Sequence, residues 1–391
     1  MRKISADYIF PVSSPPLKKG IIITDGNGRI LDLIESSAID YNLQDVEFYD
    51  GIICPGFVNT HCHLELSFML NKIKQNLGLI NFIVEIEKLK KAKKEIILLA
   101  AVEAEKQMLK NGIVAVGDIS NTNISFKIKN NSNIYFHTFI EVYSFDENKA
   151  DRIFDNAFGL NKEIKSSSIV LHTPFTVSNK LIKRVFDFAL KNNSLQTIHN
   201  QESQAENEMF LTGSGAIFEQ HKIWGNDVSK WVATGKSSLQ SMLPLIPKEL
   251  KTLFVHNTFT KKEDIDFVNE YFKNIWWSFC PNANIFIENK LPDFKLFSAF
   301  DDRITLGTDS LASNFQLSIL EEMKTITLKS NSKISLEKLI KWGTLNGAKF
   351  LNVNSKFGSF EKGKNPGINL ITDVDVNSMN LTKNSSIKVI V

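Results

Sequence analysis

Two histidines one residue apart, His61 and His63, follow an apolar run in the stretch GFVNTHCHLELS. Residues i and i+2 of a β-strand point to the same side, so both imidazoles would face one site. Imidazole nitrogens bind divalent metals, and a bound metal lowers the pKa of water from 15.7 toward about 7. The pair therefore predicts a metal site that activates water.

Further polar residues follow other apolar runs. His172, His199 and His256 each end one, Asp309 ends the last, and Glu202 comes three residues after His199. His199 and Asp309 could complete a set of three nitrogens and one carboxylate, which suits zinc or iron(II) and leaves room for water. Glu202 could supply a proton if its site raises its pKa, although it could also be an exposed residue of the acidic stretch QESQAENE.

The apolar runs themselves indicate the fold. Helix-like segments lie between most of them, and eight strands alternating with helices predict an α/β protein with a (β/α)8 TIM barrel. A doubly wound sheet is the alternative. In a barrel the chemistry gathers at the carboxyl ends of the strands, which is where these polar residues fall. The eight predicted strands are residues 52–59, 112–119, 134–142, 168–175, 195–200, 252–257, 275–280 and 303–309.

Both ends of the chain read as short strands, with a hairpin around Asp25-Gly26-Asn27-Gly28. We expect a small β-sandwich domain from residues 1–52 and 355–391, and a hydrolase barrel over 53–354. Inside the barrel the clearest helix spans 85–112 and ends at Asn111-Gly112.

Composition excludes several classes of protein. The net charge of +3 gives no footprint for nucleic acid or a membrane surface, and the basic stretch LKKAKKE reads as the solvated face of a helix. Cys54, Cys62 and Cys280 have no disulfide spacing, which favours a reducing compartment. No apolar run reaches the length of a membrane span, and the N-terminal residues lack the pattern of a signal peptide. We expect a cytoplasmic protein.

Five motifs together resemble those of the amidohydrolase superfamily, in its aminohydrolase branch of chlorohydrolase-like enzymes and nucleoside or nucleobase deaminases. They are PGFVNTHCHLE, IHNQE, LFVHNTF, SFCPNAN and LGTDSLASN, and LFVHNTF and TDSLASN look most similar to aminofutalosine deaminases. The resemblance implies one divalent metal, zinc first and iron(II) second, and a small heterocyclic substrate. A homodimer is compatible with it.

Carried over to this chain, the resemblance implies a role for each strand-end residue. The implied metal ligands are His61, His63, His199 and Asp309. Glu202 would shuttle protons, His256 would polarise the attacked centre or stabilise hydroxide, Asp309 would also take the proton of water, and His172 would contact substrate. Some members bridge two metals with a modified lysine on the fourth strand, but SIVLHTPF has none, so one metal is expected.

The resemblance has one departure. Members that act on adenosine-like substrates often carry a tryptophan segment with an acidic residue after the first motif. The corresponding stretch here, GLINFIVEIEKL, has Phe82 and no tryptophan, which argues against a standard adenosine or guanine deaminase. Hydrolytic deamination of an amino-substituted heterocycle is the function expected. Hydrolysis of a cyclic amide or a carbon–halogen bond, or metal binding without catalysis, are the alternatives.

Overall fold

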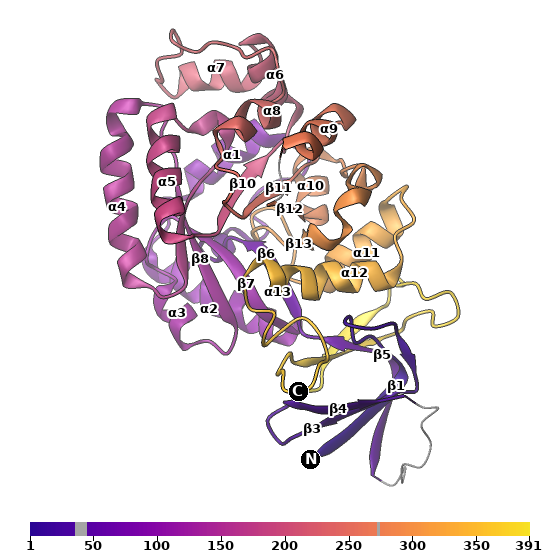
Figure 1. Ribbon diagram of the computed structural model, residues 1–391. Coiled ribbons are helices and arrows are strands. Elements are labelled where there is room, and N and C mark those ends of the chain that lie inside the picture. Colours follow the sequence, from indigo (N-terminus) through magenta and orange to yellow (C-terminus); the bar gives the residue numbers. More distant parts are fainter. Residues whose placement is uncertain (36–44, 272–273) are drawn as a thin grey trace.

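The computed structural model describes residues 1–35, 45–271 and 274–391. Its centre is a ring of eight parallel strands in two hydrogen-bonded sets of four (Figure 1). The sets meet where the amide of His199 donates to the carbonyl of His172 (2.9 Å), and where Cys62 pairs in parallel with Asp309. The barrel expected from the sequence is thereby confirmed. Its strands are β6 (Phe57–Cys62), β7 (Ile113–Ser120), β8 (Tyr135–Val142), β9 (Ser167–Leu171), β10 (Gln196–Asn200), β11 (Thr252–His256), β12 (Ile275–Phe279) and β13 (Ile304–Leu306).

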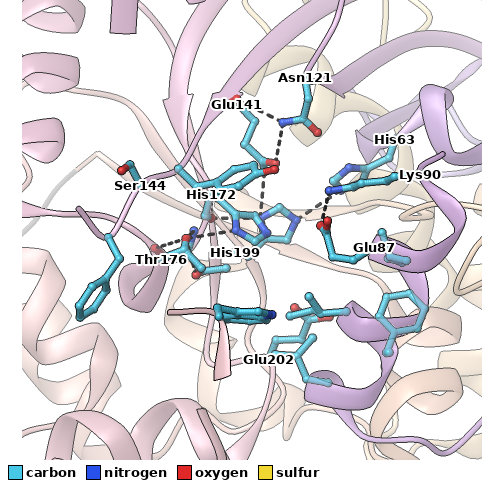
Figure 2. Close-up of a pocket in the computed structure, with 18 of the residues that line it drawn as sticks. His63, Glu87, Lys90, Asn121, Glu141, Ser144, His172, Thr176, His199 and Glu202 are labelled. Carbon is cyan, nitrogen blue, oxygen red and sulfur yellow. Dashed lines mark hydrogen bonds and ion pairs between the residues drawn. The ribbon is translucent and has the colours of Figure 1, made fainter. Parts of the chain in front are cut away.

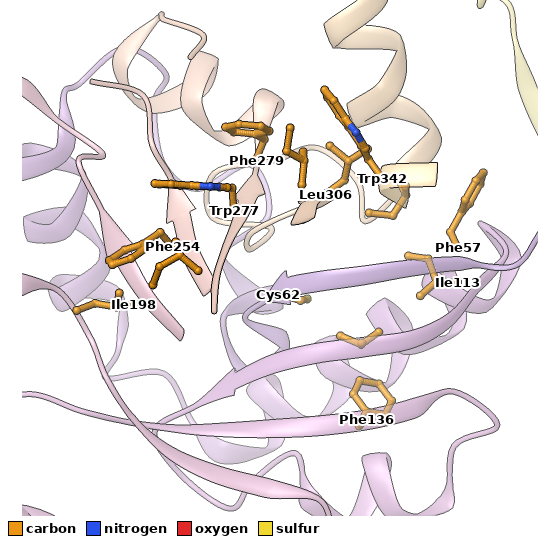
Figure 3. Close-up of a cluster of buried hydrophobic side chains, with 14 of the residues drawn as sticks. Phe57, Cys62, Ile113, Phe136, Ile198, Phe254, Trp277, Phe279, Leu306 and Trp342 are labelled. Carbon is orange, nitrogen blue, oxygen red and sulfur yellow. The ribbon is translucent and has the colours of Figure 1, made fainter. Parts of the chain in front are cut away.

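The strands are buried on both faces, as parallel strands covered by helices must be. Side-chain alternation divides their residues between two apolar clusters. Phe254 of β11 packs with Trp277 and Phe279 of β12 in the larger cluster (Figure 3), whereas its neighbours Leu253 and Val255 belong to the other. This double burial explains why the strands read as continuous apolar runs in the sequence.

Helices surround the barrel and cover its mouth (Figure 1). The described α-helices are α1 (Leu79–Leu89), α2 (Lys94–Lys110), α3 (Phe126–Asn131), α4 (Ala150–Glu163), α5 (Asn179–Asn192), α6 (Gln204–Thr212), α7 (Ala216–Ile223), α8 (Ser238–Met242), α9 (Lys262–Tyr271), α10 (Pro281–Glu288), α11 (Ile319–Lys329), α12 (Leu336–Lys341) and α13 (Gly347–Phe350). A six-residue 3-10 helix, η1 (Leu64–Met69), directly follows the first pair of histidines.

The predicted single helix over 85–112 is wrong, because α1 and α2 replace it. The chain leaves the helix at Lys90 and re-enters after Lys93, whose backbone is extended (φ −64°, ψ 142°). Like charges one turn apart repel, and this lysine-rich segment has few apolar side chains to hold a helix against the barrel. The end of α2 is as predicted, with Gly112 in a left-handed conformation (φ +70°).

The terminal segments form one sheet of seven strands beside the barrel, and both termini lie there (Figure 1). Its order is β15-β14-β5-β1-β3-β4, with β2 paired to β1, so the strands expected in a sandwich share one hydrogen-bonded sheet. Residues 36–44, inside the first predicted segment of the small domain, lie outside the described residues. The strands are β1 (Arg2–Ile9), β2 (Leu17–Lys18), β3 (Ile21–Thr24), β4 (Ile30–Ile34), β5 (Val46–Pro55), β14 (Ile368–Thr372) and β15 (Ser386–Val389).

All three cysteines are buried and unpaired. Among the described helices, none combines the length and apolar character needed to cross a bilayer.

Candidate active site

The first two histidines stand where β6 ends at the mouth of the barrel. His61 belongs to the strand and is fully buried, and His63 follows it. Their Nε2 atoms lie 3.1 Å apart. The strand end is anchored by the amide of Leu64, which donates to the carboxylate of Asp118 on β7 (2.8 Å). This hydrogen bond fixes the end of the strand. The two imidazole rings face the same site, as the i, i+2 spacing predicted.

His199 and Asp309 come to that point from other strands. Nε2 of His199, in β10, lies 3.3 Å from Nε2 of His63. Oδ1 of Asp309, beyond β13, lies 3.4 Å from Nε2 of His63 and 3.6 Å from that of His61. Asp309 has a left-handed backbone (φ +57°), and its other carboxylate oxygen accepts a hydrogen bond from Ser313. Three imidazole nitrogens and one carboxylate oxygen therefore lie close together, joined by contacts of 3.1–3.6 Å through His61 and His63.

The hydrogen bonds and the burial of these side chains set the protonation states that a cation requires of its ligands. Nδ1 of His199 faces the carbonyl of His172 (3.1 Å), which can only accept, so Nδ1 carries the proton and Nε2 keeps its lone pair. Burial lowers the pKa of His63 to about 3 and that of His199 well below its usual value, so both rings are neutral at pH 7. Burial raises the pKa of Asp309, but its hydrogen bond with His61 and the neighbouring histidines hold it below the ordinary range. This donor set fits a divalent metal.

Glu202 and His256 lie beside the cluster. Glu202 follows β10, and its Oε1 is 3.6 Å from Nε2 of His256, the last residue of β11. Nδ1 of His256 donates to Oδ1 of Asn284 (2.9 Å), which fixes the ring. Burial, with the nearby charge of Asp309, raises the pKa of Glu202 well above its usual value. Glu202 is therefore a buried carboxyl group whose environment favours the protonated form, and not an exposed loop residue.

A cavity of about 520 Å³ opens over these groups (Figure 2). Its volume lies in the range of roughly 300–1,000 Å³ typical of small-molecule sites. His172, directly after β9, lines it and packs against His199, with ring centroids 5.0 Å apart. His61 is fully buried and is not among its lining residues. The other predicted site residues that line it are His63, His199, Glu202, His256 and Asp309.

Sequence reasoning missed several lining residues. Glu141 is the next-to-last residue of β8 and is buried, with Oε1 3.5 Å from Nδ1 of His199 and Oε2 accepting from Asn121 (3.2 Å). Burial raises the pKa of Glu141 to about 7. Its position at the end of an apolar run was a usable signal. His221, which was not among the predicted site residues, lies in α7 and lines the same cavity.

The basic stretch is only partly a solvated face. Lys91 and Lys93 are exposed, but Lys90 lines the cavity and pairs with Glu87 (2.7 Å). Lys90 lies at the end of α1, on the same face as Ile86 and Glu87, which also line the cavity. The stretch without a tryptophan forms α1, and it supplies an apolar wall to the cavity that includes Leu79 and Phe82.

The fold and this cluster are those of a barrel hydrolase. The chain belongs to the amidohydrolase family, whose model matches residues 52–390. It is 28% identical over 306 residues to an aminodeoxyfutalosine deaminase of Nitratiruptor sp., covering 75% of this chain and 72% of that protein. It is 27% identical over 341 residues to an adenosine deaminase of Helicobacter pylori, covering 84% of this chain and 81% of that protein.

Solved structures share the fold. One is the aminofutalosine deaminase of Helicobacter pylori in complex with methylthio-coformycin, with a TM-score of 0.79, 22% identity and coverage of 95% of this chain and 92% of that one. Another is an adenosine deaminase from Xanthomonas campestris with bound zinc, with a TM-score of 0.72, 18% identity and coverage of 94% and 84%.

Proposed function

We propose that this protein is a metal-dependent deaminase that replaces the amino group of an adenosine-like substrate with oxygen. The observation that carries the proposal is the meeting of three histidine Nε2 atoms and one aspartate oxygen beside the buried carboxyl group of Glu202. Metal binding alone requires no such acid. Membership of the amidohydrolase family and the deaminase relatives support the same reaction class.

His61, His63, His199 and Asp309 would hold one divalent ion, for which we propose zinc first and iron(II) second. Zinc in a relative of the same fold supports the first choice. When bound, the metal would lower the pKa of water so that hydroxide is available at neutral pH. The fourth barrel strand carries no lysine, which supports one ion and not a bridged pair.

The other residues would handle protons and substrate. Glu202 would hold a proton on its carboxyl group and deliver it to the ring nitrogen beside the amino-bearing carbon. Asp309 would accept one proton of the attacking water and pass it to the amine, which leaves as ammonia. The remaining hydroxyl proton would return to Glu202 as the ring C=O forms, which restores the acid. His256, whose Nδ1 donates to Asn284, would accept a hydrogen bond at Nε2 from the hydroxide that attacks the ring. His172 would contact the sugar or ring at the cavity wall.

Three further expectations remain predictions: the division into residues 1–52 with 355–391 and residues 53–354, a homodimer, and a cytoplasmic location. They do not affect the chemistry proposed for the cavity.

Ammonia release tests the proposal. Protein supplied with zinc or iron(II) should release ammonia from adenosine or a 5′-modified adenosine and leave the corresponding inosine. Guanine, cytosine and amino-triazines complete the panel. Metal-bound protein that releases no ammonia from any member would contradict the proposal. Turnover of a chlorotriazine or a cyclic amide in its place would favour the rival hydrolytic reaction at the same site.

A further inference from the structure

The cavity extends beyond the strand ends that carry the proposed metal ligands. Phe145 follows β8, Ile153 lies in α4, His221 belongs to α7 and Trp224 follows it, and all four line the cavity. We call these four residues the outer chamber. They come from helices and loops above the barrel, where Figure 1 shows α7 as a layer over the mouth. The outer chamber therefore lies toward the entrance, and the metal ligands lie at the floor.

Aromatic rings dominate the outer chamber. The rings of Phe145 and His221 lie 4.4 Å apart, tilted by 35°, and His221 meets Trp224 edge-on at 5.5 Å. Nδ1 of His221 accepts a hydrogen bond from the side-chain amide nitrogen, Nδ2, of Asn226 (2.9 Å). Burial lowers the pKa of His221 to about 4, so the ring is uncharged at neutral pH. The chamber thus offers flat, neutral faces that suit apolar or aromatic groups.

The two lysines that line the cavity each have an acidic partner one helical turn away, in pairs that are partly exposed to solvent. Lys90 pairs with Glu87 at 2.7 Å, and Lys149 pairs with Asp146 at 3.4 Å. No arginine is among the lining residues in the part of the chain that the structure describes. A ligand carboxylate in the chamber would have to break one of these pairs or stay unmatched. Removing such a charge from water without a partner is unfavourable.

The relatives leave open what the substrate carries at its 5′ position, because adenosine and aminodeoxyfutalosine differ there. With the amino-bearing carbon at the cavity floor, the 5′ carbon of a nucleoside points toward the entrance. We propose that the outer chamber binds the 5′ substituent and selects an apolar or aromatic group over a zwitterionic amino-acid group. This inference rests on the proposed deaminase function.

Four substrates that differ only at the 5′ position test it. They are adenosine, 5′-methylthioadenosine, 5′-phenylthio-5′-deoxyadenosine and S-adenosylhomocysteine. We expect kcat/KM for the methylthio and phenylthio compounds to exceed that for S-adenosylhomocysteine at least about tenfold, since small pocket contacts commonly discriminate by 10–200-fold. Equal or better turnover of S-adenosylhomocysteine would overturn the inference while leaving deamination intact. If none of the four substrates is deaminated, both the 5′ selection and the proposed deaminase function are overturned.

Substitutions in the outer chamber test whether its residues are responsible for the selection between 5′ substituents. Phe145→Ala and Trp224→Ala should each lower kcat/KM for the phenylthio compound about tenfold and change that for adenosine less than about threefold. Phe48→Ala is the matched control, because Phe48 is a half-exposed aromatic residue of β5 that does not line the cavity. Equal losses on both substrates would contradict a role in 5′ selection, and thermal melting would check that each variant is folded.

Discussion

The backbone amide of Asp309 donates to the carbonyl of His61 at 3.0 Å, and Oδ1 of the same aspartate lies 3.6 Å from Nε2 of that histidine. Asp309 follows the last barrel strand, β13, and His61 lies in the first, β6. One backbone contact therefore closes the barrel and also sets the spacing between two proposed metal ligands. Strain at this seam should affect the metal site directly.

Gly307 tests this coupling. A Cβ at position 307 would lie 2.7 Å from Cβ of His61 and 3.0 Å from its carbonyl oxygen, so one or both must move. We expect Gly307→Ala to weaken zinc binding at least tenfold and to lower activity in parallel. Isothermal titration of zinc into metal-free protein measures the first effect. Gly159→Ala, where an added Cβ meets nothing within 4 Å, is the control. Wild-type affinity in Gly307→Ala would contradict the coupling.

Glu202 separates metal binding from proton transfer. Glu202→Gln keeps the size of the side chain but removes the acid, so kcat should fall about 10²- to 10⁴-fold, the usual contribution of general acid–base catalysis. Zinc content should stay at the wild-type value, because Glu202 is not one of the proposed ligands. Elemental analysis measures the zinc content of the variant, and steady-state kinetics measure its kcat. Near-normal kcat in this variant would remove Glu202 from the mechanism.

The buried carboxylate of Asp118, which binds the backbone after the first histidine pair, should contribute to the stability of the folded protein. Asp118 and Lys129 form an ion pair whose side chains are 0% and 1% exposed, and Asp118 also accepts from Leu64. Asp118→Asn would leave the lysine charge buried without its partner, which typically destabilises a protein by about 3–5 kcal/mol. Denaturant unfolding measures this loss. Asp118→Asn combined with Lys129→Met should recover part of it, and a single variant as stable as wild type would show that the pair contributes nothing.

Much of the barrel and the site could be predicted from the sequence. Strands buried on both faces leave apolar runs, and groups such as His199 and Asp309 interrupt those runs where the strands end. Glu141 gives the same signal, yet without a neighbouring motif it could not be distinguished from an ordinary strand-end residue.

Other features depend on tertiary packing that no local pattern encodes. The break at Lys90–Lys93 interrupts a stretch with good helix propensity, and Lys90 reaches the cavity because one face of α1 lines it. His221 reaches the same cavity because α7 packs over the mouth of the barrel, and nothing in the spacing of AIFEQHKI indicates that contact. The terminal strands could be recognised individually, but their pairing joins residues from opposite ends of the chain, such as Ile53 with Leu370.

Zinc titration of metal-free protein, with ammonia release from 5′-methylthioadenosine as the readout, tests the central claim most directly. Activity should rise in proportion to added zinc and saturate at one zinc per chain, and His63→Ala should show no such rise. Full activity in the metal-free protein, or saturation only at two zinc ions per chain, would contradict a deaminase that works with one metal held by three histidines and Asp309.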